Sequence, residues 1–346
     1  MPAATKHELL CLIDRAVAGG WDHRRACRYL ELGETRAWRW RERRAAGTLE
    51  DLAPGGRPVH AITPGEEAAI VAVFEAHQLT DRSHRKLAHR GSYEGLVWVS
   101  ESTFRRVLAA HRLRIRVPRR AGRSERAPFP DWASYERHSI WIYDTTRFAR
   151  CKSTYVVMIM DLVTRKWICE VVSAEETGLQ VQLAFTHALE LEGLLEAVDA
   201  HQTQLADPTV DDPARPVLLA VSDNGPQMTS GSTREFMAMC AIAQHFGRPG
   251  TPQDQAWIES LFSHIKADWP HLELIRDPAV LRAELASVRH EYNTQRLHAG
   301  IGYVTPDDEH EGRGPAIRQA RRVGLRRARR LRIDYHRAQR HQEPDA

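Results

Sequence analysis

The sequence predicts an α/β domain built on a mixed five-stranded sheet and preceded by two all-helical domains. Three observations support this fold class: helical periodicity broken by glycine turns in the first 117 residues, three short β-branched and aromatic runs after residue 136, and alternating helical and strand-like segments beyond them. Strands followed by alternating helices and strands are typical of an α/β layer with a mixed sheet. The 346 residues, 42% of them hydrophobic, allow two to four domains.

Composition excludes several classes of protein. The sequence contains no run of about 18 apolar residues, and its first residues lack the apolar region of a secretory signal, so we expect no membrane span and no export. The five cysteines are scattered and form no Cys-x-x-Cys pair. This pattern argues against a disulfide framework or a zinc knuckle and predicts a cytoplasmic location.

Charge is distributed unevenly along the chain. The net charge of +4 divides into +9 for residues 1–127, −12 for residues 128–310 and +7 for residues 311–346. Basic ends around an acidic centre are typical of proteins that hold nucleic acid. The alternative is that these charges form ordinary solvated surface.

Composition also predicts the domain boundaries. Stretches dense in Pro, Gly and Arg bury little apolar surface, so residues 51–62 and 118–135 are predicted to be linkers. The four parts that result are a helical domain at 1–50, a second helical domain at 63–117, the α/β core at 136–310 and an Arg-rich tail at 311–346. For the tail, non-specific DNA binding and a basic helix against a partner are both open.

The first helical domain shows a helix-turn-helix pattern. An amphipathic helix and a short second helix precede a tight turn at Leu32-Gly33, after which a third helix begins. Arginine dominates that third helix, and arginine pairs with both phosphates and guanine edges. We predict that Arg36, Arg39 and Arg43 bind DNA; the alternative is a solvated basic face over a small tryptophan core.

Residues 63–117 repeat this pattern. Thr63, followed by Pro and then Glu66, predicts a capping box at the start of a helix, and two further helices follow. We predict a second helix-turn-helix unit in which Arg105 and Arg106 bind DNA. The alternative is a plain helical spacer.

In residues 136–310 the sequence pattern changes from helical periodicity to short strand-like runs. Runs at 138–146, 154–162 and 167–173 predict three antiparallel strands, the last two joined by a hairpin at Thr164-Arg165. Buried runs predict two more strands at 217–221 and 241–246, and helical periodicity predicts helices at 178–192, 232–240 and 254–269.

Three carboxylates fall where these elements can converge. Asp144 lies in the first strand, Asp223 follows the fourth strand, and Glu259 lies inside the last helix. Strand ends of α/β sheets face a common crevice, and Mg²⁺ prefers the oxygen ligands that clustered carboxylates provide. Taken singly, each has an ordinary alternative: a solubility charge on a strand, a turn residue in Asp-Asn-Gly-Pro, or an exposed helical charge.

Four segments favour a joint role for these carboxylates. They are Trp141–Thr146, Val221–Gly225, Gln253–Lys266 and Tyr292–His298, and 35 residues separate Asp223 from Glu259. In this order and spacing the chain resembles insertion-sequence transposases with an integrase-type catalytic core, relatives of retroviral integrases. The resemblance covers about residues 6–310. The His/His/Cys/Cys zinc module of retroviral integrases is missing from the sequence.

The resemblance implies an RNase H-like core and a transposase that cuts and joins DNA. Asp144, Asp223 and Glu259 would be the catalytic residues and would hold two Mg²⁺ ions, for which Mn²⁺ can substitute. Two such ions about 4 Å apart stabilise the attacking and leaving oxygens of a phosphoryl displacement. Lys266, two helical turns after Glu259 and on the same helix face, would hold a DNA phosphate. Further DNA contacts are expected from Arg296 and His298.

The resemblance also implies partners. These are double-stranded DNA, as terminal inverted repeats and as target, and further copies of the chain in a dimer or tetramer, because two DNA ends must be paired. We expect a nucleoid-associated protein without a membrane partner. Two alternatives stay open: a catalytically inactive, domesticated transposase that acts as a sequence-specific DNA-binding regulator, and a structure-selective nuclease that does not join strands.

Overall fold

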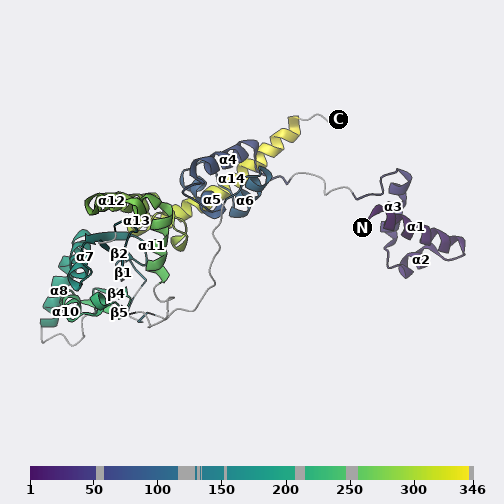
Figure 1. Ribbon diagram of the computed structural model, residues 1–346. Helices are drawn as coiled ribbons and strands as arrows, with labels where there is room; N and C mark the ends of the chain where they lie inside the picture. The colour runs from purple at the N-terminus through teal and green to yellow at the C-terminus, as the bar shows by residue number, and fades with distance from the viewer. Residues whose placement is uncertain are drawn as a thin grey trace. The chain divides into compact units, whose positions relative to one another are not determined.

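The structure of the chain is a computed structural model (Figure 1). It describes residues 1–51, 58–115, 129–130, 133, 135–151, 154–206, 215–246 and 256–342, with backbone alone for 204–206, 256, 257, 259 and 340–342. The chain divides into two compact units, residues 1–61 and residues 62–346.

The first unit is a three-helix domain. Its helices are α1 (Ala3–Ala18), α2 (His23–Tyr29) and α3 (Glu34–Ala45). Leu10, Ile13 and Trp40 meet in its small core. The carboxylate of Asp22 accepts a hydrogen bond from the N–H of Arg25 and so caps α2. These helices and the turn before α3 lie where the sequence predicts them.

The second unit begins with three more helices. These are α4 (Pro64–His77), α5 (His84–Tyr93) and α6 (Glu101–Ala110). Ile70, Leu87 and Phe104 lie in their shared core. The predicted capping box is present, because Thr63 and Glu66 each accept a hydrogen bond from the backbone N–H of the other.

A mixed five-stranded sheet follows, as predicted. Its strands are β1 (Ile140–Thr146), β2 (Tyr155–Asp161), β3 (Trp167–Ser173), β4 (Leu218–Ser222) and β5 (Ile242–Phe246), in the order β3-β2-β1-β4-β5. The first three strands are antiparallel to one another, whereas β4 and β5 are parallel to β1. The predicted hairpin joins β2 to β3, and Arg165 adopts a left-handed φ of 66° within it.

Helices cover both faces of this sheet (Figure 1). One face packs against helices that include α7 (Gly178–Leu191), with α8 (Leu195–Ala206), α9 (Pro226–Thr229) and α10 (Gly231–Met239) nearby. The other face packs against α11 (Ala256–Asp268) and α12 (Pro278–Thr294), which are joined by the 3-10 helix η2 (Pro270–Leu274). Along β1, even-numbered Ile140 and Ile142 face α11, whereas odd-numbered Trp141 and Tyr143 face α7.

The last part of the chain is helical and returns to the second helical domain. It comprises the 3-10 helix η3 (Ala299–Ile301), α13 (Pro306–His310) and α14 (Gly314–Gln342). The guanidinium of Arg332 on α14 pairs with the Glu66 carboxylate of α4 at 2.9 Å. The Arg-rich tail is therefore a helix packed against the same chain.

Most of the two predicted linkers falls outside the described residues. The boundaries drawn at residues 117 and 136 stay predictions, because both sides belong to one compact unit. Among the helices that the structure describes, none is both long enough and apolar enough to cross a membrane.

Candidate active site

Asp144 lies in β1, and Asp223 lies one residue beyond the end of β4, the parallel neighbour of β1. The pairing of β1 with β4 places Ile142 opposite Val221, two residues before Asp144 and two residues before Asp223. Side chains alternate between the two faces of a strand, so Asp144 shares a face with Ile142. Its antiparallel neighbour Met158 belongs to the core on that face. Asp144 is therefore on the sheet face that α11 covers, and Asp223 follows the end of the neighbouring strand.

Backbone groups hold each of these carboxylates. Oδ1 of Asp144 accepts a hydrogen bond of 2.7 Å from the N–H of Thr145, and Oδ1 of Asp223 accepts one of 2.9 Å from the N–H of Gly225. A Cβ at Gly225 would meet Oδ1 of Asp223 at 3.0 Å, so the absence of a side chain there leaves room for the carboxylate. The turn role of Asp223 weighed from the sequence is thus confirmed, because its carboxylate binds the backbone of its own turn. Both aspartates are half-buried.

The pKa of the buried Tyr143 phenol is raised above its ordinary value. Burial raises the pKa of Tyr143, and the negative charges of Asp223 and Asp144 raise it further. Its ring packs edge-on against Phe185, with 4.8 Å between ring centroids.

Glu259 belongs to α11, which packs against β1. Ile258, Leu261 and Ile265 anchor this helix on the sheet face that carries Asp144. The side chain of Glu259 lies outside the described residues, so its distance from the aspartates stays untested. Its backbone position is seven residues before Lys266 and therefore on the same helix face.

Lys266 lies beside the end of β1. Its Nζ donates a hydrogen bond of 2.7 Å to the carbonyl oxygen of Arg147 and lies 3.6 Å from Oε1 of Glu273. The ammonium also lies 5.3 Å from the centre of the Phe148 ring. Because 33% of the side chain is exposed, the lysine is accessible to a ligand at this edge of the sheet.

Arg296 and His298 are partly buried. Arg296 pairs with Asp268 at 3.2 Å, and its side chain is 9% exposed. Nδ1 of His298 accepts a hydrogen bond from the N–H of Gly300, and burial holds the pKa of His298 well below its usual range. These contacts give both residues a packing role, and their contact with DNA stays a prediction.

The arginines predicted to bind DNA differ in how far their side chains are exposed. Arg36 and Arg39 on α3 are exposed, as are Arg105 and Arg106 on α6. Arg43 is half-buried, and its Nε donates a hydrogen bond of 3.0 Å to the carbonyl oxygen of Thr48 at the end of its own domain.

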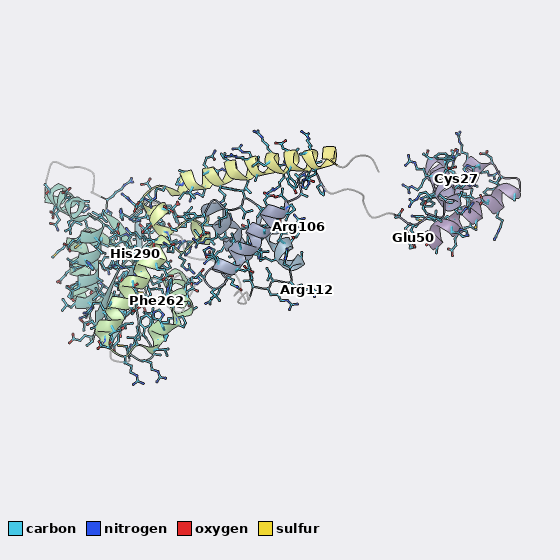
Figure 2. All side chains as sticks on the ribbon, turned by 90° about the horizontal axis from the view of Figure 1, so that it is seen from above. Cys27, Glu50, Arg106, Arg112, Phe262 and His290 are labelled. Carbon is cyan, nitrogen blue, oxygen red and sulfur yellow. The ribbon has the colours of Figure 1, made fainter. Side chains whose placement is uncertain are left out.

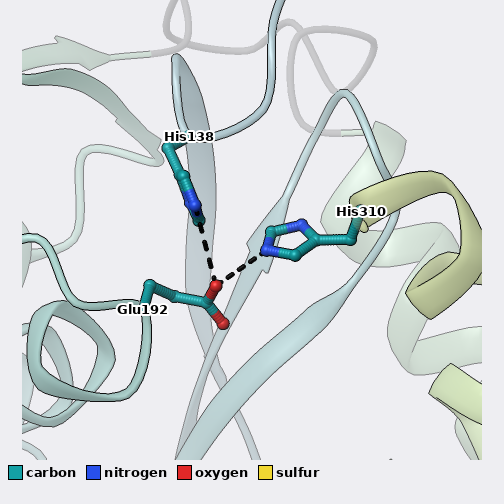
Figure 3. Close-up of side chains that lie close together, drawn as sticks. All are labelled: His138, Glu192 and His310. Atoms are coloured by element: carbon teal, nitrogen blue, oxygen red, sulfur yellow. Dashed lines mark hydrogen bonds and ion pairs between the residues drawn. The ribbon is translucent and has the colours of Figure 1, made fainter. Parts of the chain in front are cut away.

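A second cluster of ligand-type side chains lies at the opposite end of β1 (Figure 3). Oε2 of Glu192 is 2.7 Å from Nε2 of His310 and 3.8 Å from Nε2 of His138, and Oε1 is 2.9 Å from Nζ of Lys166. The three atoms that could bind a metal lie within 4.8 Å of one another. Sequence reasoning missed this cluster, because its members come from distant segments without a local motif.

The Glu192 carboxylate of this cluster is held in its charged form by its neighbours. Although burial raises it, hydrogen bonds from His310 and Lys166 hold the pKa of Glu192 at about 2. Burial and the neighbouring His310 lower the pKa of His138 to about 4. The carboxylate is already shared by a lysine and a histidine, so the cluster ties three segments of the core together.

Comparisons with known proteins agree with this architecture. One model described as an integrase core domain matches residues 134–252, and another with the same description matches residues 240–306. The transposase for insertion sequence element IS904 of Lactococcus lactis subsp. lactis (strain IL1403) is 25% identical over 178 residues. This match covers 49% of the chain and 60% of that transposase, so the chain spans less than two thirds of its relative.

Two solved structures are also similar. The catalytic core domain of BIV integrase shares 21% identity and a TM-score of 0.34, over 51% of this chain and 95% of that chain. The simian T-cell lymphotropic virus intasome in complex with PP2A regulatory subunit B56 gamma shares 15% identity and a TM-score of 0.36, over 69% and 74% of the two chains. The two integrase core matches together span residues 134–306, so the α/β core of the chain is of the integrase type, and about half of the chain is similar to an insertion-sequence transposase.

Proposed function

We propose that this chain is a DNA strand transferase that cuts the ends of a mobile element and joins them to target DNA. The observation that supports this most is the parallel pairing of β1, which contains Asp144, with β4, which ends one residue before Asp223, on a sheet that the helix containing Glu259 covers. Residues from three distant segments are thereby assigned to one edge of the sheet.

The donor set suits a divalent cation. Carboxylates that converge on one site repel each other, and a bound cation removes that cost. Asp144, Asp223 and Glu259 would hold two Mg²⁺ ions, or Mn²⁺ in their place. Such ions supply charge stabilisation at the attacking and leaving oxygens of an in-line displacement.

The chain's own residues would position DNA for two balanced steps. In the first, a water oxygen bonds to phosphorus and the 3′ oxygen of the element end leaves as a hydroxyl. In the second, that hydroxyl bonds to a target phosphorus and the target's 3′ oxygen leaves, so the number of phosphodiester bonds is conserved. Lys266 would bind a phosphate oxygen beside the carboxylates, because its partly exposed side chain lies at the end of β1.

The helical domains would select the DNA ends. Exposed Arg36 and Arg39 on α3, and exposed Arg105 and Arg106 on α6, are placed on the last helix of a three-helix unit, where a recognition helix stands. They would bind terminal inverted repeats, and a dimer or tetramer of the chain would pair two ends.

A strand-transfer assay with the element's own ends and Mg²⁺ tests this proposal. We expect Glu259→Gln to bind the ends like the wild type but to lose cleavage and joining by about 10²–10³-fold or more, because charge stabilisation of the transition state is removed. The matched control is Glu235→Gln, which removes an exposed carboxylate from α10 and should leave both steps unchanged.

Each other outcome of this assay would indicate a different function for the chain. Cleavage without joining would indicate a nuclease, and specific binding without metal-dependent cleavage would indicate a regulator. Full activity of Glu259→Gln would overturn the assignment of the site.

A further inference from the structure

One side of α14, here called its inner side, contacts other residues of the same chain. The guanidinium of Arg321 donates hydrogen bonds to Oγ of Ser92 at 3.1 Å and to the carbonyl oxygens of Gly302 at 2.9 Å and Tyr303 at 2.8 Å. Ala328 on the same side is 7% exposed. This side therefore attaches the helix to the second helical domain and to the end of the core.

Two further contacts fix the helix in place. A Cβ at Gly324 would lie within 3 Å of the indole of Trp98, so the ring packs directly on the helix backbone. Arg332 pairs with Glu66 and donates a hydrogen bond of 2.6 Å to the carbonyl oxygen of Trp98. The inner arginines are structural residues, and they are not available to an external ligand.

The opposite side of α14, here called its outer side, is exposed and basic. It carries six exposed arginines: Arg322, Arg326, Arg327, Arg329, Arg330 and Arg337. At about 100° per residue, most of them lie opposite the side marked by Arg321, Ala328 and Arg332. Apart from Arg322, which bonds to Gln319, none of the six makes a hydrogen bond or ion pair with any residue that the structure describes.

Side chains along this outer side extend away from the helices that α14 packs against (Figure 2). The helix is 29 residues long, which corresponds to about 44 Å. Within its described residues the only acidic side chain is Asp334. The result is a long, rigid row of guanidinium groups held at a fixed place on the second helical domain.

We propose that this outer face binds the phosphate backbone of double-stranded DNA without regard to sequence. The inference rests on the proposed function, because DNA is the polyanion that such a protein handles. Duplex DNA carries one negative charge per about 1.7 Å of its axis, so a row of arginines along a helix can meet several phosphates. The helix moves with Arg105 and Arg106, because Arg332 ties it to their domain.

A second copy of the chain is the competing occupant. Exposed Leu331 and Tyr335 on α14 would suit a partner helix. Packing two copies of this helix together, however, would bring their unpaired guanidinium groups into mutual repulsion. Charge complementarity therefore favours DNA.

The salt dependence of DNA binding tests this surface. The full chain is titrated with a short duplex of unrelated sequence over a range of KCl concentrations, and binding is followed by fluorescence anisotropy. Each phosphate contact contributes about 0.9 to the slope of log K against log salt concentration, so Arg326→Gln with Arg330→Gln should reduce the slope by about 1.8. The control pair, Arg215→Gln with Arg234→Gln, removes two exposed arginines from the core and should leave the slope unchanged.

The results separate this inference from the strand-transfer proposal. Binding is measured without cleavage, so loss of catalytic activity would not affect the prediction. An unchanged slope in the α14 variant, with an unchanged melting temperature, would overturn the surface and leave the active site intact. A change in oligomeric mass with an unchanged slope would assign the face to a second copy and would also overturn it.

Discussion

At the scale of single residues, the candidate site depends on short backbone contacts. The N–H groups of Thr145 and Gly225 each donate to an oxygen of the neighbouring catalytic candidate, so the two carboxylates are oriented by their own chain. Groups that are already oriented need little rearrangement when charge develops in a transition state. This local order explains why an Asp-Asn-Gly-Pro turn can serve both the fold and a metal site.

The sequence predicts which residue types the first helical domain offers, but it does not predict their partners. Arg36 and Arg39 are exposed. In contrast, Arg41 and Arg44 of the same helix pair with Asp14 on α1, at 2.6 Å and 2.9 Å. Pairing across helices depends on tertiary packing, which composition and helical periodicity do not contain.

The cluster of His138, Glu192 and His310 predicts a pH-dependent stability. His138 has a pKa of about 4 in the folded chain against an ordinary value of 6.5. Between these values the unfolded chain binds a proton that the folded chain does not, so stability falls as pH falls from 6.5 to 4. We expect His138→Asn to flatten this dependence, and asparagine tolerates the left-handed φ of 66° at this position.

Denaturation midpoints measured between pH 7 and pH 4 check this expectation. His264, whose pKa burial also lowers to about 4, will keep part of the slope. Exposed His290→Asn is the control and should leave the curve as it is in the wild type. An equally steep curve for His138→Asn would show that the cluster does not carry the effect.

At the scale of elements, hydrophobic periodicity and glycine or proline breaks predicted all five strands of the core and its helices α7, α10 and α11. The sequence interpretation missed α12, although Asp277-Pro278 is a helix start and Leu281, Leu285 and Val288 recur at helical spacing within it. The docking of α14 could not be predicted from a hydrophobic pattern. Its inner side is attached through Arg321 and Arg332, which pair with carbonyl oxygens and a carboxylate instead of packing as apolar residues.

The contact between α14 and Trp98 predicts a stability effect. We expect Gly324→Leu to destabilise the second unit by about 1–3 kcal/mol, because the new side chain must displace the indole or the helix. Thermal unfolding measures the change. Ala320→Leu is the control, because it introduces the same side chain at an exposed position of the same helix. Equal melting temperatures for the two variants would mean that the contact between Gly324 and Trp98 does not stabilise the packing of α14.

At the scale of the whole molecule, the charge distribution and the fold class were both accessible from the sequence. The basic head contains the three-helix units, the acidic centre contains the sheet, and the basic tail is α14. The convergence of Asp144 and Asp223 stays a prediction, because spacing along a chain does not determine which strands pair. The parallel pairing of β1 with β4, and the register within it, are properties of the folded sheet.

The most direct test of the central claim is the joined product formed by Asp144→Asn and Asp223→Asn in the strand-transfer assay with Mg²⁺. Both variants keep the shape of the side chain and lose one negative charge. The account predicts that each binds the element ends like the wild type and forms no joined product above background, whereas Asp199→Asn, an exposed control on α8, joins strands normally. Joining at the wild-type rate by either site variant would contradict a catalytic role for the aspartates at this edge of the sheet.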